Sequence, residues 1–383
     1  MKARKIISKI HLWLGLCSGL LVFIIAITGC IYAFQEEIQD MTQPYRFVEE
    51  TETPYLPPSK IREIADAELP DKHIHAVMYH TENRAAKAIY YSFEDHYYLT
   101  AYLNPYTGDV LHIKDEFSGF FRFILDGHFY LWLPPDIGQP VVASATLVFL
   151  VMLVSGIFLW WPKNGKNIPQ RFSVRWKSRW RRKNYDLHQV LGFYIIVFAV
   201  IFALTGLVWG FEWFRDGYYA AITGGKDYKD YYDPDSEHTA APAGIADVPA
   251  IDQVWLKMQQ EYPDAAWIEI HPPEDEFSSI AANANPDAST YWQIDYRYFD
   301  QYSLKELPVD HIWNRFDEAS AGDKLMRMNY DIHVGAILGL PGKFLAFFVS
   351  LVVASLPVTG FLIWYGRKKK NKHKKQRKEM VTA

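Results

Sequence analysis

The chain has 383 residues, of which 50% are hydrophobic and 22% are charged, and its formal net charge is −4. Length alone allows two or three domains. Hydropathy places the chain among membrane proteins rather than ordinary soluble ones, because four stretches carry no charge and are long enough to cross a bilayer, which needs about 20 apolar residues. These stretches are 11–34, 137–161, 187–211 and 344–365.

The first stretch, 11–34, is typical of a signal anchor. It is too long for a cleavable signal peptide, and the residues from Cys30 to Phe34 lack a small-residue cleavage site. Both cysteines of the chain, Cys17 and Cys30, lie within this stretch. The segments outside the membrane therefore have no disulfide framework and must be stabilised by ordinary cores.

Lysine and arginine are concentrated next to the spans. Four precede the first span, nine lie in the 162–186 loop with no acidic residue before Asp186, and nine follow Gly366. Cytoplasmic loops carry such an excess, so we expect both termini and this loop to be cytoplasmic. Each basic run adjoins a span, which disfavours nucleic-acid binding, and the tail is predicted to contact anionic lipid.

Two long segments, 35–127 and 212–332, lie on the opposite side and are too long for plain loops. Each contains a helical pattern followed by runs rich in β-branched and aromatic residues, which predict strands. The expected helices are 58–65 and 251–262, and the expected strands are 75–79, 88–93 and 97–103 in the first segment and 267–271, 278–282 and 291–298 in the second. The unit of span, small α+β domain and span therefore occurs twice in one orientation, and such repeats commonly place binding sites at their interface.

Four histidines occupy matched positions in the two units. His11 and His188 open uncharged helical runs, and each is followed seventeen residues later by a Thr-Gly pair. His128 and His333 precede the other two runs, which close on a Ser-Gly and a Thr-Gly pair. The glycines of these pairs are Gly29, Gly206, Gly156 and Gly360. An ionisable residue in a membrane is costly and marks function by default, so the pattern predicts two matched cofactor sites.

Further motifs accompany the histidines. They are His-x3-Gly in the first span, Asn-Pro-Tyr-Thr-Gly-Asp at 104–109, Ser-Gly-x3-Trp-Trp-Pro at 155–162, Asp-Leu-His at 186–188 and Ile-His-x-Gly-x3-Gly at 332–339. Their order and spacing resemble the PepSY-associated transmembrane proteins over nearly the whole chain. The resemblance implies a bacterial inner-membrane protein, often iron-regulated, in a family that includes haem-containing reductases of ferric siderophores. The flavin reductase domain fused to some members is missing here, so the electron donor stays open between quinol and a cytoplasmic reductase.

Topology sorts the four histidines by depth. His11 and His188, the inner pair, begin outward-going helices and are expected near the cytoplasmic face. His128 and His333, the outer pair, are expected near the periplasmic face, on short helices that prolines separate from the spans. Two facing imidazoles can supply both axial ligands of a b-type haem. With the resemblance, this predicts two haem b groups whose iron atoms are bound by these four histidines.

The glycines are expected at the opposite depth from the histidines of their own helices. Gly29 lies 18 residues beyond His11, which is about 27 Å along a helix, and so reaches the level of the outer pair. Gly206 is expected at that level too, and Gly156 and Gly360 at the level of the inner pair. A missing side chain would let a macrocycle lie against the backbone, so all four glycines are candidate cofactor contacts. The alternative is that they serve helix packing alone.

The predicted fold is an α-helical membrane protein with four transmembrane helices in two same-orientation repeats, each carrying a periplasmic α+β PepSY-like domain. The predicted boundaries are 1–34 for the N-terminal tail and first span, 35–116 for the first domain, 117–161 for a pre-span helix and the second span, 162–186 for the basic loop, 187–211 for the third span, 212–328 for the second domain, 329–365 for a pre-span segment and the fourth span, and 366–383 for the basic tail.

The resemblance makes a ferric siderophore the best candidate for the periplasmic electron acceptor. Reduction of Fe(III) to Fe(II) would release the metal, because hard oxygen donors hold Fe(II) far less tightly. Two alternatives stay open. One is a haem-free membrane anchor whose PepSY-like domains bind peptides or regulate a periplasmic protease, and the other is an assembly or transport partner for iron or copper. No catalytic nucleophile, acid–base dyad or nucleotide-binding loop is evident in the sequence.

Overall fold

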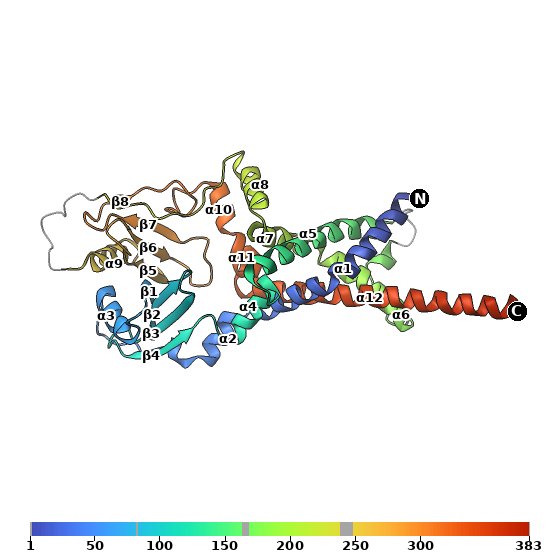
Figure 1. Ribbon diagram of the computed structural model, residues 1–383, viewed down its shortest axis with the longest axis horizontal. Coiled ribbons are helices and arrows are strands. Elements are labelled where there is room, and N and C mark those ends of the chain that lie inside the picture. Colours follow the sequence, from blue (N-terminus) through green and yellow to red (C-terminus); the bar gives the residue numbers. More distant parts are fainter. Residues whose placement is uncertain (1, 82, 163–167, 238–247, 383) are drawn as a thin grey trace. The chain divides into compact units, whose positions relative to one another are not determined.

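The computed structural model describes residues 2–81, 83–162, 168–237 and 248–382, with side chains as far as Lys370. Residues 163–167 of the predicted basic loop, and the side chains of the basic tail beyond Lys370, lie outside this description. The chain forms two compact units (Figure 1). The helical unit comprises Met1–Phe34, Phe123–Arg215 and Ile332–Ala383, and the sheet unit comprises Gln35–Arg122 and Asp216–Asp331.

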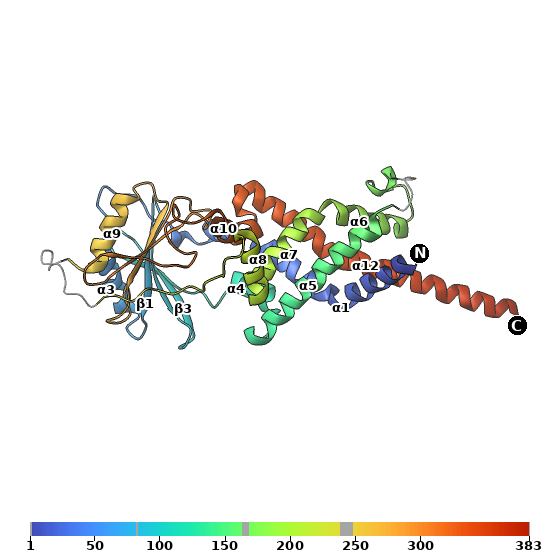
Figure 2. The same ribbon diagram turned by 90° about the horizontal axis from the view of Figure 1, so that it is seen from above.

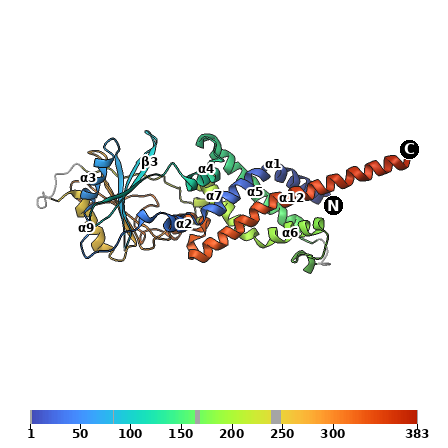
Figure 3. The same cartoon turned by 90° about the horizontal axis from the view of Figure 1, so that it is seen from below.

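Within the described ranges, three helices of the helical unit are long and apolar enough to cross a membrane. They are α1 (Lys2–Tyr32), α5 (Pro135–Trp160) and α12 (Gly339–Thr382), and they coincide with three of the predicted spans (Figure 3). The remaining predicted span, 187–211, is not one straight helix. It is divided between α6 (Trp180–Tyr194) and α7 (Ile196–Gly210), which meet at a bend of 63°. Taken together, these two helices make a fourth candidate span.

The break between α6 and α7 lies at Ile195, whose N–H points to the carbonyls of both Leu191 and Phe193. Gly192 lies three residues before the break, and glycine weakens a helix interior by about 1 kcal/mol relative to alanine. Hydropathy registers neither feature, which is why the sequence predicted an uninterrupted span.

The long helices pack through small and branched apolar side chains. One core joins α1, α5, α7 and α12 through the buried residues Val22, Ala26, Leu153, Ala199, Val353 and Ala354. Small residues at helix contacts are usual in lipid, where close packing rather than hydrophobic burial holds helices together. The outward-facing side chains Leu20, Val154 and Phe348 are apolar too and more than half exposed. This pattern suits a bundle surrounded by lipid.

Short helices occupy the two positions where the sequence predicted pre-span segments. They are α4 (Phe120–Tyr130), which carries His128, and α11 (Asn329–Val334), which carries His333. After α11 the chain turns sharply at Gly335, whose φ is +82°, into the 3-10 turn η3 (Ala336–Leu338). A Cβ atom on Gly335 would lie 2.3 Å from the carbonyl oxygen of Gly342, so only glycine fits there.

The sheet unit contains one antiparallel sheet of eight strands in the order β4-β3-β2-β1-β5-β6-β7-β8. The strands are β1 (Ile74–His80), β2 (Ala86–Ser92), β3 (Tyr97–Leu103), β4 (Val110–Asp115), β5 (Trp267–His271), β6 (Ile280–Asn285), β7 (Asp295–Phe299) and β8 (Glu306–Leu307). The central pair, β1 and β5, is antiparallel, with Val77 opposite Ile270. The two segments that the sequence predicted as separate α+β domains therefore share a single sheet.

Two helices cover one face of this sheet (Figure 2). They are α3 (Pro58–Glu68) and α9 (Ala250–Glu261), one from each segment. Both helices meet the sheet in one continuous core, whose fully buried side chains include Ile61, Val77, Tyr90, Val254, Met258, Ile270 and Phe299. The remaining short helices are α2 (Gln35–Thr42), η1 (Pro44–Arg46), η2 (Pro169–Arg171), α8 (Glu212–Thr223) and α10 (Ala321–Arg327).

The turns that follow β3 and β7 have the same construction. The side chain of Asn104 accepts a hydrogen bond from the N–H of Tyr106, and Asp300 likewise accepts from the N–H two residues further on. Gly108 and Leu304 then occupy the same place in their turns, with φ of +82° and +56°. Leucine seldom adopts this conformation, so the side-chain bonds of Asp300 must hold that turn in shape.

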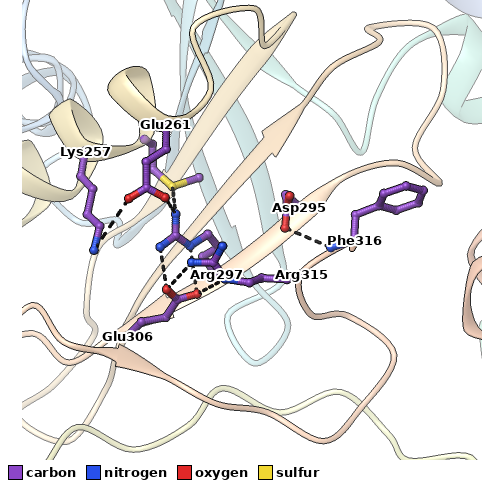
Figure 4. Close-up of polar contacts among 8 residues, drawn as sticks. Lys257, Glu261, Asp295, Arg297, Glu306, Arg315 and Phe316 are labelled. Carbon is purple, nitrogen blue, oxygen red and sulfur yellow. Dashed lines mark hydrogen bonds and ion pairs between the residues drawn. The ribbon is translucent and has the colours of Figure 1, made fainter. Parts of the chain in front are cut away.

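A buried arginine ties α9 to the far edge of the sheet (Figure 4). Arg297 of β7 is 1% exposed and forms ion pairs with Glu261 of α9 and Glu306 of β8. Arg315 also bonds to Glu306, with Nε 2.7 Å from Oε1. Burial acts to raise the pKa of Glu306, but the hydrogen bonds from Arg315 and Arg297 outweigh it and lower the pKa to about 2.

Replacing Glu306 by glutamine should destabilise the sheet unit at neutral pH. The change removes the charge that holds two guanidinium groups, and we expect the free energy of unfolding to fall by about 1–2 kcal/mol at pH 7, allowing for partial exposure of the side chain. The folded-state pKa lies below the unfolded value of about 4.3, so this contribution is present above that pH and is lost as the pH falls toward the folded value.

The measurement is a urea titration of the full chain in detergent, read by pulsed amide exchange in β7. Lys257→Gln is the matched control, because its pair with Glu261 is partly exposed and 4.0 Å long. A Glu306→Gln effect of the same size at pH 7 and at pH 2 would contradict the charge-based explanation.

Candidate cofactor site

Both histidines of the inner pair bond through Nδ1 to a hydroxyl on a neighbouring helix. His11 Nδ1 lies 2.8 Å from Ser155 Oγ, which joins α1 to α5. His188 Nδ1 lies 2.8 Å from Thr359 Oγ1, which joins α6 to α12. In each case the hydroxyl belongs to the residue just before one of the candidate glycines.

The histidines of the outer pair also bond through Nδ1 to a group on a neighbouring helix, but only one of the two closest partners is a hydroxyl. His333 Nδ1 lies 2.8 Å from Thr205 Oγ1, which joins α11 to α7. His128 Nδ1 instead lies 2.8 Å from the carbonyl oxygen of Ile25 on α1, and Thr28 Oγ1 is further away, at 3.4 Å. Three of the four rings therefore use a hydroxyl as the closest partner, and one uses a backbone carbonyl.

The four candidate glycines lie against these imidazoles. A Cβ atom built on the glycine would lie 2.8 Å from the histidine Cε1 at Gly29 (His128), 3.3 Å at Gly206 (His333), 3.4 Å at Gly360 (His188) and 3.7 Å at Gly156 (His11). Each glycine thus lies at the level of the pair to which the helical rise assigned it. The sequence predicted that the glycines leave room for a macrocycle, whereas in the structure the imidazole ring itself takes this room.

The structure brings the two histidines of the outer pair close together. The rings of His128 and His333 have centroids 6.1 Å apart and planes inclined by 62°. The outer pair therefore combines one histidine from the first half of the chain with one from the second.

Aromatic side chains surround the outer pair. Trp209 and Phe202 flank His333, with ring centroids at 5.3 and 6.0 Å. Phe129 lies beside His128 at 5.9 Å. An apolar shell of this kind limits the access of solvent and lowers the local dielectric constant around a metal site.

The sequence reasoning missed the polar groups that hold the histidines. The hydroxyl residue before each glycine was visible as a signal, since it occurs in all four pairs, but Thr or Ser beside Gly is also common in packed membrane helices. Asn184 had no such signal. This buried residue lies one turn before His188 on α6, and its Nδ2 donates to the carbonyl of Thr359 at 3.0 Å.

A second polar cluster lies in the sheet unit, on β5 and β6. His271 Nε2 lies 3.3 Å from Glu269 Oε2 and 3.2 Å from Asn283 Nδ2. Burial acts to lower the pKa of His271, but the charge of Glu269 outweighs it and raises the pKa. Within the described part of the chain, no group of three or more His, Cys, Asp or Glu side chains could hold a metal ion. The cluster is described best as a partly buried ion pair.

Comparison with known proteins assigns the sequence to a family. No functionally curated protein matches the sequence. The sequence profile of the PepSY-associated TM region matches residues 8–367, which include all four histidines and their glycines. The chain therefore belongs to the PepSY-associated transmembrane family of membrane proteins.

Proposed function

We propose that this protein is a di-haem electron-transfer protein of the bacterial inner membrane that reduces a ferric siderophore on the periplasmic side. The observation that supports it most directly is that the rings of His128 and His333 lie beside one another and that all four histidines are held at Nδ1. Histidine nitrogens are ligands that haem iron accepts, so each pair would hold one such group.

The spacing of the outer pair fits this group. A metal bound midway between two imidazoles, about 2 Å from each nitrogen, separates the ring centroids by about 6 Å. The centroids of His128 and His333 are 6.1 Å apart. The aromatic side chains around them provide the apolar surroundings that a haem requires.

The chemistry supplied by bound haem is one-electron transfer through the Fe(III)/Fe(II) couple. The residues of the chain hold and tune that group. His11 and His188 would bind it at one level of the bundle, and His128 and His333 at the other. About 27 Å of helix separates Gly29 from His11, so the two levels lie near opposite ends of α1.

Exposed aromatic side chains near the outer pair support an acceptor with flat or aromatic groups. Trp132 lies just beyond the end of α4, is 44% exposed and stacks on Phe123 with centroids 5.0 Å apart. Iron chelates are bulky and often aromatic, and such side chains can stack against them. The excess of Lys and Arg in the 162–186 loop and the tail supports the cytoplasmic placement of the opposite end.

Histidine substitution tests the two binding levels. The wild-type chain should contain two b-type haems, His333→Ala should lose mainly the outer one and His188→Ala mainly the inner one, because each loses an axial ligand. Pyridine haemochrome assays and EPR of the full chain in detergent measure this. His73→Ala, exposed in the sheet unit, is the control. Folded but colourless wild-type protein would contradict the proposal and favour a haem-free anchor.

Alanine substitution of the glycines gives a graded test. At Gly29 the new Cβ would lie 2.8 Å from His128 Cε1, so the ring must move, whereas at Gly156 it would lie 3.7 Å from His11, which is ordinary contact. We expect Gly29→Ala to disturb the EPR signal of the outer haem and Gly156→Ala to leave the inner one nearly unchanged. Equal effects of both variants would show that the glycine contacts do not control the ligands.

The direction of electron transfer can be tested in oriented membranes. An impermeant ferric siderophore should be reduced by spheroplasts, whose periplasmic face is outside, and not by inside-out vesicles with dithionite-reduced protein. Fe(II) is trapped and measured with a ferrous chelator. Membranes that contain His333→Ala are the control, because they lack the outer ligand. Equal reduction from both faces would contradict the proposed polarity.

A further inference from the structure

The hydroxyl groups beside the histidines donate their hydrogen atoms within their own helices. Thr205 Oγ1 donates to the carbonyl of Ile201 at 2.8 Å, and Thr359 Oγ1 donates to the carbonyl of Ser355 at 3.0 Å. Ser155 Oγ donates to the carbonyl of Met152 at 3.0 Å. A hydroxyl has one hydrogen and two acceptor sites, so each oxygen can still accept a hydrogen bond from an imidazole.

This bonding favours one of the two neutral tautomers of each ring. When the hydroxyl accepts, Nδ1 must be the donor. At His128 the partner of Nδ1 is the carbonyl oxygen of Ile25, which can only accept a hydrogen bond. Nδ1 of His128 must therefore be the donor, whatever the neighbouring hydroxyl does. A neutral imidazole carries one proton, so Nε2 is left with its lone pair.

We propose that Ser155, Thr205 and Thr359 are positioning residues, which together with the Ile25 carbonyl hold the four histidines as Nδ1–H tautomers with Nε2 presented to iron. The inference rests on the proposed haem function and adds to it the groups that orient the ligands. A hydrogen bond to the outer nitrogen of a metal-bound histidine fixes its tautomer and ring orientation and raises its basicity.

The chain offers an internal control for the hydroxyl. Thr28 corresponds to Thr205, but its hydroxyl lies 3.4 Å from His128, whose closer partner is the Ile25 carbonyl. The Thr28 hydroxyl also donates to the carbonyl of Ile24 at 2.7 Å, a common bond within a helix. Loss of the Thr205 hydroxyl should therefore weaken the positioning of His333, and loss of the Thr28 hydroxyl should leave the positioning of His128 unchanged.

Substitution of threonine by valine tests the role of the hydroxyl group without changing the shape of the side chain. Thr205→Val keeps the volume and the β-branch, and Thr205→Ser restores the hydroxyl without the methyl group. The carbonyl of Phe202 also interacts with His333 and remains in the variant. We therefore expect Thr205→Val to lower haem affinity at the outer level about tenfold, the low end of the range for such partners. The midpoint potential of that haem should rise, because a less basic ligand stabilises Fe(III) less.

The experiment uses the full chain in detergent. Haem affinity is measured by transfer of haem to apomyoglobin, and the potential by optical redox titration. Thr28→Val and Thr205→Ser should resemble the wild type, and the inner haem should be unchanged in every variant, which reports that the bundle is folded. A Thr205→Val protein with wild-type affinity and potential would overturn the positioning role.

The tautomer is measured independently of haem. In ¹⁵N-histidine-labelled protein prepared without haem, the signal that disappears in His333→Ala should belong to an imidazole protonated at Nδ1. A ring protonated at Nε2 would overturn the inference even if haem binds. Wild-type protein that binds no haem would overturn the proposed function instead, and the positioning role toward iron with it.

Discussion

The helical unit depends on the need to satisfy four imidazoles inside an apolar bundle. A buried polar group without a hydrogen bond is costly, and each ring finds its partner on another helix. These bonds join α1 to α5, α1 to α4, α6 to α12 and α7 to α11. Lipid provides little hydrophobic drive for helices to associate, so these bonds add to the close packing of the apolar core that joins α1, α5, α7 and α12. The glycines beside the bonds give the imidazoles room.

The hydrogen bonds of the imidazoles and the histidine pairs connect different parts of the chain. Each hydrogen bond lies within one half of the sequence, so α1, α4 and α5 form one group and α6, α7, α11 and α12 another. The histidine pairs cross between these groups, as His128 and His333 do. A cofactor held by such a pair would add a link between the two halves at each level of the bundle.

The sheet unit joins the two halves by another means. Each half contributes four strands and one covering helix, and the β1–β5 pair makes them continuous. The core beneath α3 and α9 contains residues from both halves, so the two segments share it. This sheet unit is stabilised by a shared apolar core and not by disulfides, since both cysteines are free and lie in the helical unit.

Features that depend on the order of residues along the chain could be predicted without a structure. Apolar length located the spans, runs of β-branched and aromatic residues located most strands, and the constant helical rise put Gly29 and Gly206 at the level of His128 and His333. Which surfaces meet depends on packing in three dimensions. A run of β-branched and aromatic residues does not specify its partner strand, so the shared sheet was not predicted, and hydropathy does not register the bend at Ile195. The bonds of the histidines to Ser155, Thr205 and Thr359 depend on how neighbouring helices are rotated about their axes, and the order of residues along one helix does not specify that rotation.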